Sequence, residues 1–248
     1  SVYDAAGRLI YSVDALNDVT RYAYDANGNV VTKSSYATPL SGSVQYTKAW
    51  ISAHLVTSAS TDQITRSVYD AAGRLIYSVD ALNGVTQYVY DANGNIIVKT
   101  AYAKPINGAI QYTKEWISTN LVSDSSNDRV THQIYDAADR VVYSVDARNY
   151  VTQYAYDQIG QVVQKTQYNN VLSGTIQYTQ SWVSQNQTLD SQNDQTTQTS
   201  YDATGRIATI TDAKGNKEYY SYDGLGNKKT YTNKNGSIWN YNYDAAGR

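Results

Sequence analysis

The chain has 248 residues, a formal net charge of −2 and 26 Tyr, but no Cys, Met or Phe. Without Cys, a disulfide framework, a thiol nucleophile and a cysteine-ligated metal are excluded, and two His are too few for a multi-histidine metal site. The near-neutral charge gives no general electrostatic reason to expect nucleic-acid binding, and no apolar stretch is long enough to span a bilayer. We therefore expect no nucleic-acid partner and no membrane span.

Strand-forming and turn-forming residues dominate the composition. All acidic residues except Glu115 and Glu218 are Asp, and Tyr, Val, Thr, Ser, Asn and Gly are abundant. β-branched and aromatic residues favour strands, whereas Asp, Asn and Gly favour tight turns, and most good helix formers are scarce here. The composition therefore predicts an all-β chain with many turns.

The sequence is built from repeats. The pattern Tyr-Asp-x-x-x-Arg starts four times at intervals of 66 residues, at Tyr3, Tyr69, Tyr135 and Tyr201. We divide the chain into units at residues 3–68, 69–134, 135–200, 201–221 and 222–242, with a partial unit at 243–248. Such self-similarity is typical of repeat architectures. We therefore expect a single array over residues 1–248, interpreted as a fragment of a longer array because neither end resembles a capping repeat.

Each long unit begins with the sequence of paired strands. In the first unit, the β-prone residues 19–24 and 30–33 flank the segment Asp-Ala-Asn-Gly-Asn. Asp25 can accept hydrogen bonds from the following backbone amides, and Gly28 can adopt a positive φ at little cost. A second turn sequence, at residues 14–17, lies about ten residues earlier. This spacing predicts tandem antiparallel β-hairpins with strands of about six residues.

The recurring motif defines the residues that we expect to be structural. Tyr should pack on a strand face, Asp should begin the turn, Gly should allow its backbone conformation, and Arg should pair with Asp across the turn. The predicted motif residues are Tyr3, Asp4, Gly7, Arg8, Tyr24, Asp25, Gly28, Tyr69, Asp70, Gly73, Arg74, Tyr90, Asp91, Gly94, Tyr135, Asp136, Tyr156, Asp157, Tyr201, Asp202, Gly205, Arg206, Tyr222, Asp223, Tyr243 and Asp244.

A third register in each long unit contains a tryptophan. Trp50, Trp116 and Trp182 occupy the same offset, four residues after the Tyr of a Gln-Tyr-Thr sequence. We expect these tryptophans to be strand residues that share a face with Tyr46 and its counterparts. They can pack as a structural spine, which repetition favours, or they can form an exposed stripe for stacking on glycans.

The sequence predicts no catalytic, cofactor-binding or metal site. His54 and His132 are not repeated at equivalent positions of the other units, and no nucleophile elbow, zinc-protease or phosphate-loop motif is present. The Asp-Ala-Asn-Gly-Asn loops at Asp25 and Asp91 lack the terminal Glu of an EF-hand loop. We therefore expect a chain that is not an enzyme and that requires no cofactor.

Residues 69–95, YDAAGRLIYSVDALNGVTQYVYDANGN, and residues 201–227, YDATGRIATITDAKGNKEYYSYDGLGN, resemble the YD-repeat or RHS-repeat family. The resemblance implies β-hairpins wound side by side into a continuous spiralling, superhelical β-sheet. In RHS proteins, in the C-subunits of insecticidal toxin complexes and in teneurins, that sheet forms a hollow shell. The shell of the bacterial toxins encloses a toxin segment, and other members are wall-associated proteins.

The resemblance predicts a non-enzymatic structural segment of a secreted or surface-exposed bacterial protein, in which the hairpins form part of a shell or scaffold. Two alternatives remain open: a cell-surface adhesion or glycan-binding module with aromatic stripes, and an extracellular filament-forming repeat protein. The expected partners are flanking repeats or neighbouring copies, an enclosed toxin segment, or surface glycans.

Overall fold

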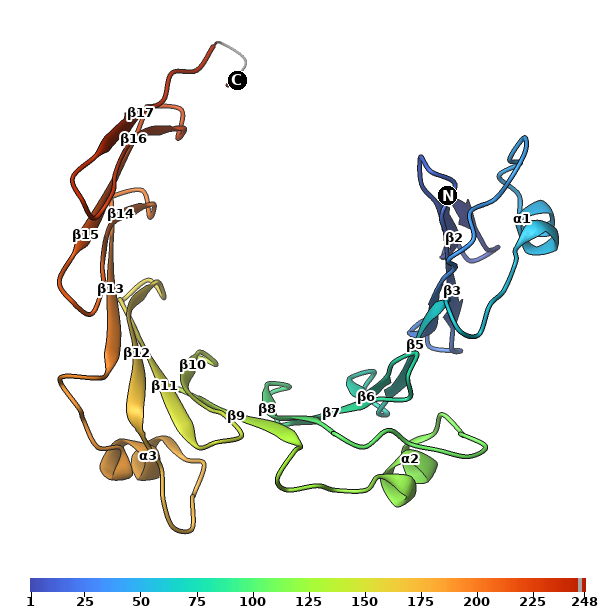
Figure 1. Cartoon of the computed structure of the whole chain (residues 1–248), viewed down its shortest axis with the longest axis horizontal. Helices are drawn as coiled ribbons and strands as arrows, with labels where there is room; N and C mark the ends of the chain where they lie inside the picture. The colour runs from blue at the N-terminus through green and yellow to red at the C-terminus, as the bar shows by residue number, and fades with distance from the viewer. Residues whose placement is uncertain (245–246) are drawn as a thin grey trace. The chain divides into compact units, whose positions relative to one another are not determined.

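The computed structural model describes residues 1–244 and 247–248, so part of the predicted unit at 243–248 lies outside the described residues. It contains seventeen strands and three helices of seven residues each within this part of the chain (Figure 1). The chain divides into two compact units, Ser1–Val130 and Thr131–Arg248. From here on, "unit" means one of these two parts, and "repeat" means one of the 66-residue sequence repeats.

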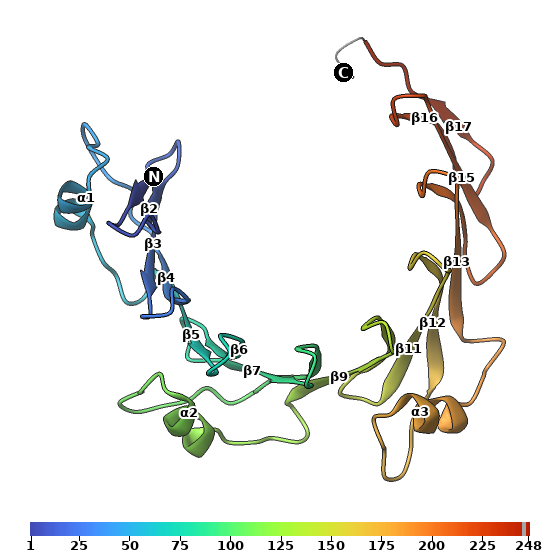
Figure 2. The same ribbon diagram turned by 180° about the vertical axis from the view of Figure 1, so that it is seen from behind.

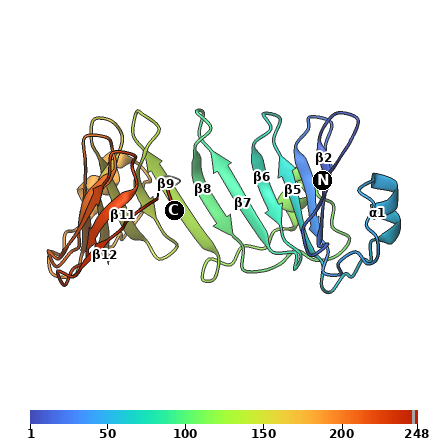
Figure 3. The same ribbon diagram turned by 90° about the horizontal axis from the view of Figure 1, so that it is seen from above.

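The first unit holds eight complete strands and two helices. They are β1 (Val2–Tyr3), β2 (Leu9–Val13), β3 (Val19–Tyr24), β4 (Val30–Ser35), α1 (Lys48–His54), β5 (Gln63–Tyr69), β6 (Leu75–Val79), β7 (Val85–Tyr90), β8 (Ile96–Ala101) and α2 (Lys114–Asn120). Each of the strands β1 to β7 pairs antiparallel with the strand that follows it in sequence. Figure 3 shows β5, β6, β7 and β8 side by side.

The second unit continues the same pattern. Strand β9 (Arg129–Tyr135) contains the junction between the two units, and its residues from His132 onward pair with β10. The following elements are β10 (Val141–Val145), β11 (Tyr150–Tyr156), β12 (Val162–Val171), α3 (Gln180–Asn186), β13 (Gln195–Tyr201), β14 (Ile207–Thr211), β15 (Lys217–Tyr222), β16 (Lys228–Thr232) and β17 (Ile238–Asn240). Again every strand from β9 to β16 pairs antiparallel with its successor. The predicted all-β fold of tandem hairpins is confirmed.

The described strands that carry a Tyr-Asp motif have an irregularity at the Tyr. In β7, Val89 pairs with Val98 but Tyr90 pairs with Ile96, so one residue of β8 is unpaired. Shifts of the same kind precede Tyr24, Tyr69, Tyr156, Tyr201 and Tyr222. A β-bulge turns the side chains that follow it relative to the regular alternation. The extra residue lies on the strand that follows the turn, as Ile97 of β8 does, so the bulge reorients side chains of that strand beside the Asp turn.

Each 66-residue repeat has its own hydrophobic core on one face of the sheet. In the second repeat, Val79 and Val85 of neighbouring strands pack with Ile106 and Ile117, and each of these four is at most 2% exposed. The corresponding buried clusters are Val2, Tyr11, Val19, Tyr36, Leu40 and Ile51 in the first repeat, and Ile134, Tyr143, Val145, Val151, Leu172 and Val183 in the third. The core thus lies between the sheet and the segment that contains the helix.

The prediction that the three tryptophans lie on strands is wrong. Trp50, Trp116 and Trp182 each lie in one of the short helices, which the long β4–β5 connection and its two counterparts carry beside the sheet (Figure 2). The physical reason is a helix start that recurs: the hydroxyl of Thr47 accepts a hydrogen bond from the Trp50 amide at 3.2 Å. A Thr at this position satisfies one of the free amides of the first turn, and burial of Ile51 stabilises the helix further.

Candidate functional site

The Tyr-Asp motif folds into a turn that its Asp side chain closes. Asp4 Oδ1 accepts hydrogen bonds of 2.9 Å from the amides of Ala6 and Arg8, while the amide of Asp4 donates to the Arg8 carbonyl. Gly7 has a φ of 75°, a left-handed conformation that glycine adopts without a Cβ penalty. Asp139 takes the same left-handed conformation in the third repeat, with a φ of 56°, so this position requires a positive φ and Gly is the residue that adopts it most easily.

The arginine of the motif joins one hairpin to the next. Arg8 Nε donates to Asp4 Oδ2 at 2.8 Å, and Arg8 Nη1 donates at 3.4 Å to the carbonyl of Asp25, in the turn between β3 and β4. The guanidinium also lies 4.8 Å from the ring centroid of Tyr24. The Tyr24 hydroxyl in turn donates to the carbonyl of Leu9 at 2.7 Å. We call this set of contacts the Arg–Tyr clamp.

The clamp recurs with nearly the same geometry. In the second repeat, Arg74 Nε lies 2.7 Å from Asp70 Oδ2, and Arg74 Nη1 donates to the Asp91 carbonyl at 3.2 Å. The Arg74 guanidinium lies 4.9 Å from the ring of Tyr90. Matching contacts join Arg140 to Asp136, Asp157 and Tyr156, and join Arg206 to Asp202 and Tyr222. Four equivalent arginines therefore hold successive hairpins in register.

The turns of the second Tyr-Asp motif in each repeat, which begin at Asp25 and its counterparts, use a side-chain amide in place of arginine. Asn29 Nδ2 donates to Asp25 Oδ2 at 2.9 Å, and Asn95 and Asn227 make the same bond to Asp91 and Asp223. Gln161 replaces Asn in the third repeat, and its longer side chain donates to the carbonyl of Gly205 at 2.7 Å instead. The Asp of each of these turns therefore has a neutral amide instead of a cation as its side-chain partner. In the third repeat the side-chain amide of Gln161 joins two hairpins.

Hydrogen bonds lower the pKa of the Asp25 and Asp70 carboxyl groups and so favour their ionised form. Hydrogen bonding from the Arg74 amide, and next from its side chain, lowers the pKa of Asp70. The side-chain hydrogen bond from Asn29 lowers the pKa of Asp25, although its partial desolvation acts in the opposite direction. A carboxylate stabilised as an anion favours a fixed structural partner over proton transfer near neutral pH. The electrostatics of the motif thus match a structural role.

The tryptophan rings contribute to the cores. Trp50, Trp116 and Trp182 are partly buried and pack against the first, second and third hydrophobic clusters respectively. The ring of His54 stacks on Trp50 with centroids 4.0 Å apart, and His54 Nδ1 lies 2.8 Å from the Trp50 carbonyl oxygen. Asn120 and Asn186 donate at 2.8 Å to the equivalent carbonyls. His54 therefore makes the same helix-end contact as the Asn of the other repeats.

A second set of Asp residues, outside the Tyr-Asp motifs, closes the helix-containing segments. Asp62 is 5% exposed; its two carboxylate oxygens accept hydrogen bonds from the amides of Ala37 at 3.0 Å and Ser58 at 2.8 Å. Asp128 and Asp194 repeat this arrangement. The signal was present in the sequence, because these three Asp lie 66 residues apart.

No group of three or more His, Asp or Glu in the described residues could hold a metal ion. None of the helices in this part of the chain is long and apolar enough to cross a membrane. The features that recur from repeat to repeat are the Arg–Tyr clamp, the turn of the Tyr-Asp motif, and the Asp that closes each helix-containing segment.

Together these features define a tandem β-hairpin repeat protein whose hairpins are joined by Arg–Tyr clamps. Residues 3–38, 69–104 and 201–238 match the family model described as RHS Repeat. The chain carries RHS repeats, and the resemblance to the YD-repeat or RHS-repeat family is confirmed. Three of the four Arg–Tyr clamps lie within the matched segments.

Solved structures of Tc toxins share the fold. The chain is 18% identical to a chain of a TcdB2-TccC3-Cdc42 crystal structure, with a TM-score of 0.56 over 93% of this chain and 10% of that one. For a Photorhabdus luminescens Tc holotoxin pore with a TccC3 mutation, the identity is 16% and the TM-score 0.58, over 97% and 11% of the two chains. The chain thus spans about a tenth of those chains. No curated protein matches it.

Proposed function

We propose that the chain is a non-enzymatic structural segment of a secreted or surface-exposed bacterial RHS-repeat protein. In this role it forms part of a β-sheet shell or scaffold of the toxin-encapsulating type, as one array that continues into flanking repeats. The partners of such a segment are those flanking repeats and an enclosed polypeptide.

The Arg–Tyr clamp is the observation that carries this proposal. The arginine of each clamp pairs with the Asp of its own turn and covers the Tyr ring of the next hairpin, as Arg74 does with Asp70 and Tyr90. The Arg and Asp side chains of the motif therefore hold neighbouring hairpins together. A sheet built in this way resists local opening, which suits a wall.

The partly buried tryptophans support the same role. Trp116 packs against the second hydrophobic cluster, together with Leu121 and Tyr112, and its backbone is held in a capped helix. A ring packed in this way stabilises the repeat, and this favours packing over an exposed stripe as the role of Trp50, Trp116 and Trp182.

Limited proteolysis tests the scaffold role, with a matched pair of arginine variants. Arg140 forms a clamp, whereas Arg148 lies exposed at the tip of the next turn. We expect Arg140→Ala to accelerate cleavage within β10 to β12 and Arg148→Ala to cleave as the wild type does. Equal cleavage of the two variants would show that the clamp does not hold the wall.

Enclosure is tested in the longer protein that contains these repeats. We expect polypeptide outside the repeats to resist added protease, and to become accessible when the arginines of several clamps are replaced by Ala. A non-repeat segment that is cut as fast in the native protein as in the clamp variant would contradict enclosure while leaving the scaffold role intact.

A further inference from the structure

One face of the sheet in the second unit is bare where the earlier repeats have a core. Thr209, Thr211 and Lys217 occupy the positions that Tyr77, Val79 and Val85 occupy 132 residues earlier. The earlier three are at most 4% exposed, beneath the helix-containing segment of their repeat.

Within the residues that the structure describes, no such segment follows the later hairpin. Strands β16 and β17 are joined by a tight turn, in which the Asn233 amide donates to the Ser237 carbonyl at 3.0 Å. The positions that are apolar beneath the cover of the second repeat are therefore polar in the later hairpin, which has no cover. An apolar segment cannot replace that cover, because it would bury the ammonium of Lys217 without a partner, at a large cost in free energy.

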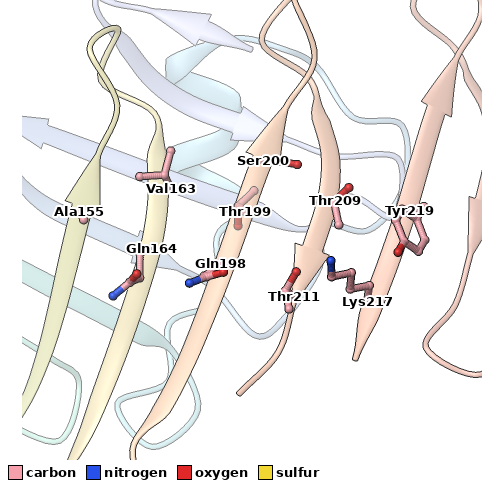
Figure 4. Close-up of a pocket in the computed structure, with 10 residues that line it drawn as sticks. All are labelled: Ala155, Val163, Gln164, Gln198, Thr199, Ser200, Thr209, Thr211, Lys217 and Tyr219. Atoms are coloured by element: carbon pink, nitrogen blue, oxygen red, sulfur yellow. The ribbon is translucent and has the colours of Figure 1, made fainter. Parts of the chain in front are cut away.

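The bare face forms a shallow groove with a volume of about 450 Å³ (Figure 4). Its side chains form two rows in cross-strand register. Gln164, Gln198, Thr211 and Lys217 pair in succession across β12, β13, β14 and β15, and the second row is Ser200, Thr209 and Tyr219. With neighbouring strands about 4.8 Å apart, the first row extends over about 14 Å. The groove is therefore long and shallow, and it suits an extended ligand.

The polar groups in the groove are available for a ligand. Within the described part of the chain, no hydrogen bond engages the side chains of Gln198, Thr209 or Thr211, although Gln164 donates to Thr166 at 3.2 Å. Amides and hydroxyls both donate and accept, as the hydroxyls of a sugar do. Tyr219 is 49% exposed and offers an aromatic face beside them.

The charge of the groove points to an anion. Lys217 is the charged side chain among the residues that line it. Glu218, the next residue, accepts hydrogen bonds from Tyr220 at 2.9 Å and Tyr231 at 3.0 Å on the opposite face of the sheet. Asp212 is paired with Lys234 at 2.9 Å. Neither nearby carboxylate is therefore free to compete for Lys217.

We propose that this groove is a binding site for an acidic oligosaccharide. Lys217 pairs with a carboxylate of the glycan, a sugar ring packs on Tyr219, and the row from Gln164 to Thr211 exchanges hydrogen bonds with its hydroxyls. None of the three helix tryptophans lines the groove, and the site does not depend on them or on the proposed scaffold role.

Titration calorimetry of the 248-residue chain with two probes tests the proposal. The acidic probe is a hyaluronan tetrasaccharide, which carries uronic acid carboxylates, and the neutral probe is chitotetraose. We expect the acidic probe to bind more tightly, with an affinity that falls as salt is added. No binding of the acidic probe at millimolar concentration, or tighter binding of chitotetraose, would overturn the proposal.

Variants then locate the site. Lys217→Gln and Tyr219→Ala should each weaken binding of the acidic probe about tenfold, since each removes one charge-assisted or aromatic contact. Lys48→Gln and Tyr46→Ala, two exposed residues of the first unit, are the matched controls and should bind as the wild type does. If Tyr219→Ala does not fold, Gln198→Ala takes its place in the comparison. Wild-type affinity in the groove variants would place the glycan elsewhere and refute the site.

Discussion

At the scale of single residues, the excess of Tyr and Asp in the composition has a geometric explanation. Several of the Tyr residues in Tyr-Asp motifs donate from their hydroxyl to a carbonyl of the neighbouring strand, as Tyr156 does to Val141 at 2.8 Å and Tyr222 to Ile207 at 3.0 Å. Phe could fill the same space but could not donate this bond. The absence of Phe from the chain is therefore consistent with a repeat in which the ring and its hydroxyl both act.

The hydroxyl of Tyr90 provides a direct test of this explanation. It donates to the Leu75 carbonyl at 2.7 Å in a partly buried position. Tyr90→Phe leaves that carbonyl without its partner and should lower the free energy of unfolding by about 1 kcal/mol, as measured by urea denaturation.

Tyr88 is the matched control for that substitution. It lies two residues earlier in β7, and no hydrogen bond of its hydroxyl occurs among the described residues. Tyr88→Phe should change the free energy of unfolding by less than about half as much. Equal effects of the two substitutions would mean that the hydrogen bond of the Tyr90 hydroxyl does not contribute to stability.

The turn carboxylates predict how stability depends on pH. Hydrogen bonds from the Arg140 side chain and backbone lower the pKa of Asp136 below its ordinary value of 3.8. A carboxyl group whose pKa is lower in the folded state stabilises the fold fully above its unfolded-state pKa, and this stabilisation is lost as the pH falls. We expect the urea midpoint to be constant near neutral pH and to fall steadily below about pH 4.

Two substitutions separate this effect from general acid denaturation. Arg140→Gln removes the side-chain partner of Asp136 and should make the fall of the urea midpoint shallower. Arg148→Gln removes an equal charge from an exposed turn tip and should leave the slope unchanged. The same slope in both variants would assign the acid sensitivity to other groups.

At the scale of elements, the hairpins were predictable from the sequence and the helices were not. Asp and Gly at fixed offsets, as at Asp25 and Gly28, dictate a turn through local backbone geometry, and flanking β-branched residues favour strands. The helices have only seven residues, too few for a periodic pattern, and tertiary packing decides their conformation. The Thr47 cap followed by apolar Trp50 and Ile51 was the available signal.

Only part of the Arg–Tyr clamp was predictable from the sequence. The pairing of Asp4 with Arg8 followed from their spacing within one turn, and the structure shows it at 2.8 Å. The contact of Arg8 with the Tyr24 ring joins residues of two different hairpins. That contact depends on the register between strands and on the bulge in β4 opposite Tyr24, which no local pattern encodes.

The burial of Ile117 should determine whether helix α2 packs against the core of its repeat. Ile117 of α2 is fully buried, whereas its neighbour Ser118 is exposed. Ile117→Ala removes several buried carbon atoms and should lower the free energy of unfolding by about 3 kcal/mol, whereas Ser118→Ala should cost far less. Fluorescence of Trp116, which packs on the same cluster, reports the change. Loss of stability without a change in Trp116 fluorescence would show that α2 stays docked.

At the scale of the whole molecule, the repeats supply their own controls, because the core of each repeat is built from equivalent residues. Val79 in the first unit and Val145 in the second are both fully buried and occupy the same place in their repeats. In an array whose repeats contact mainly their neighbours, stability is approximately a sum of repeat and interface contributions. Damage to one core should therefore remain local.

Hydrogen exchange of two matched variants tests this locality. Val79→Ala and Val145→Ala should each cost about 2 kcal/mol, since they remove the same carbon atoms from equivalent cores. Val79→Ala should accelerate exchange in β5 to β8, and Val145→Ala should accelerate it in β10 to β12, with the other unit little changed. Uniform acceleration over both units would mean that the chain opens as one cooperative body. In that case the clamps would couple neighbouring repeats into a single unfolding unit in spite of their separate cores.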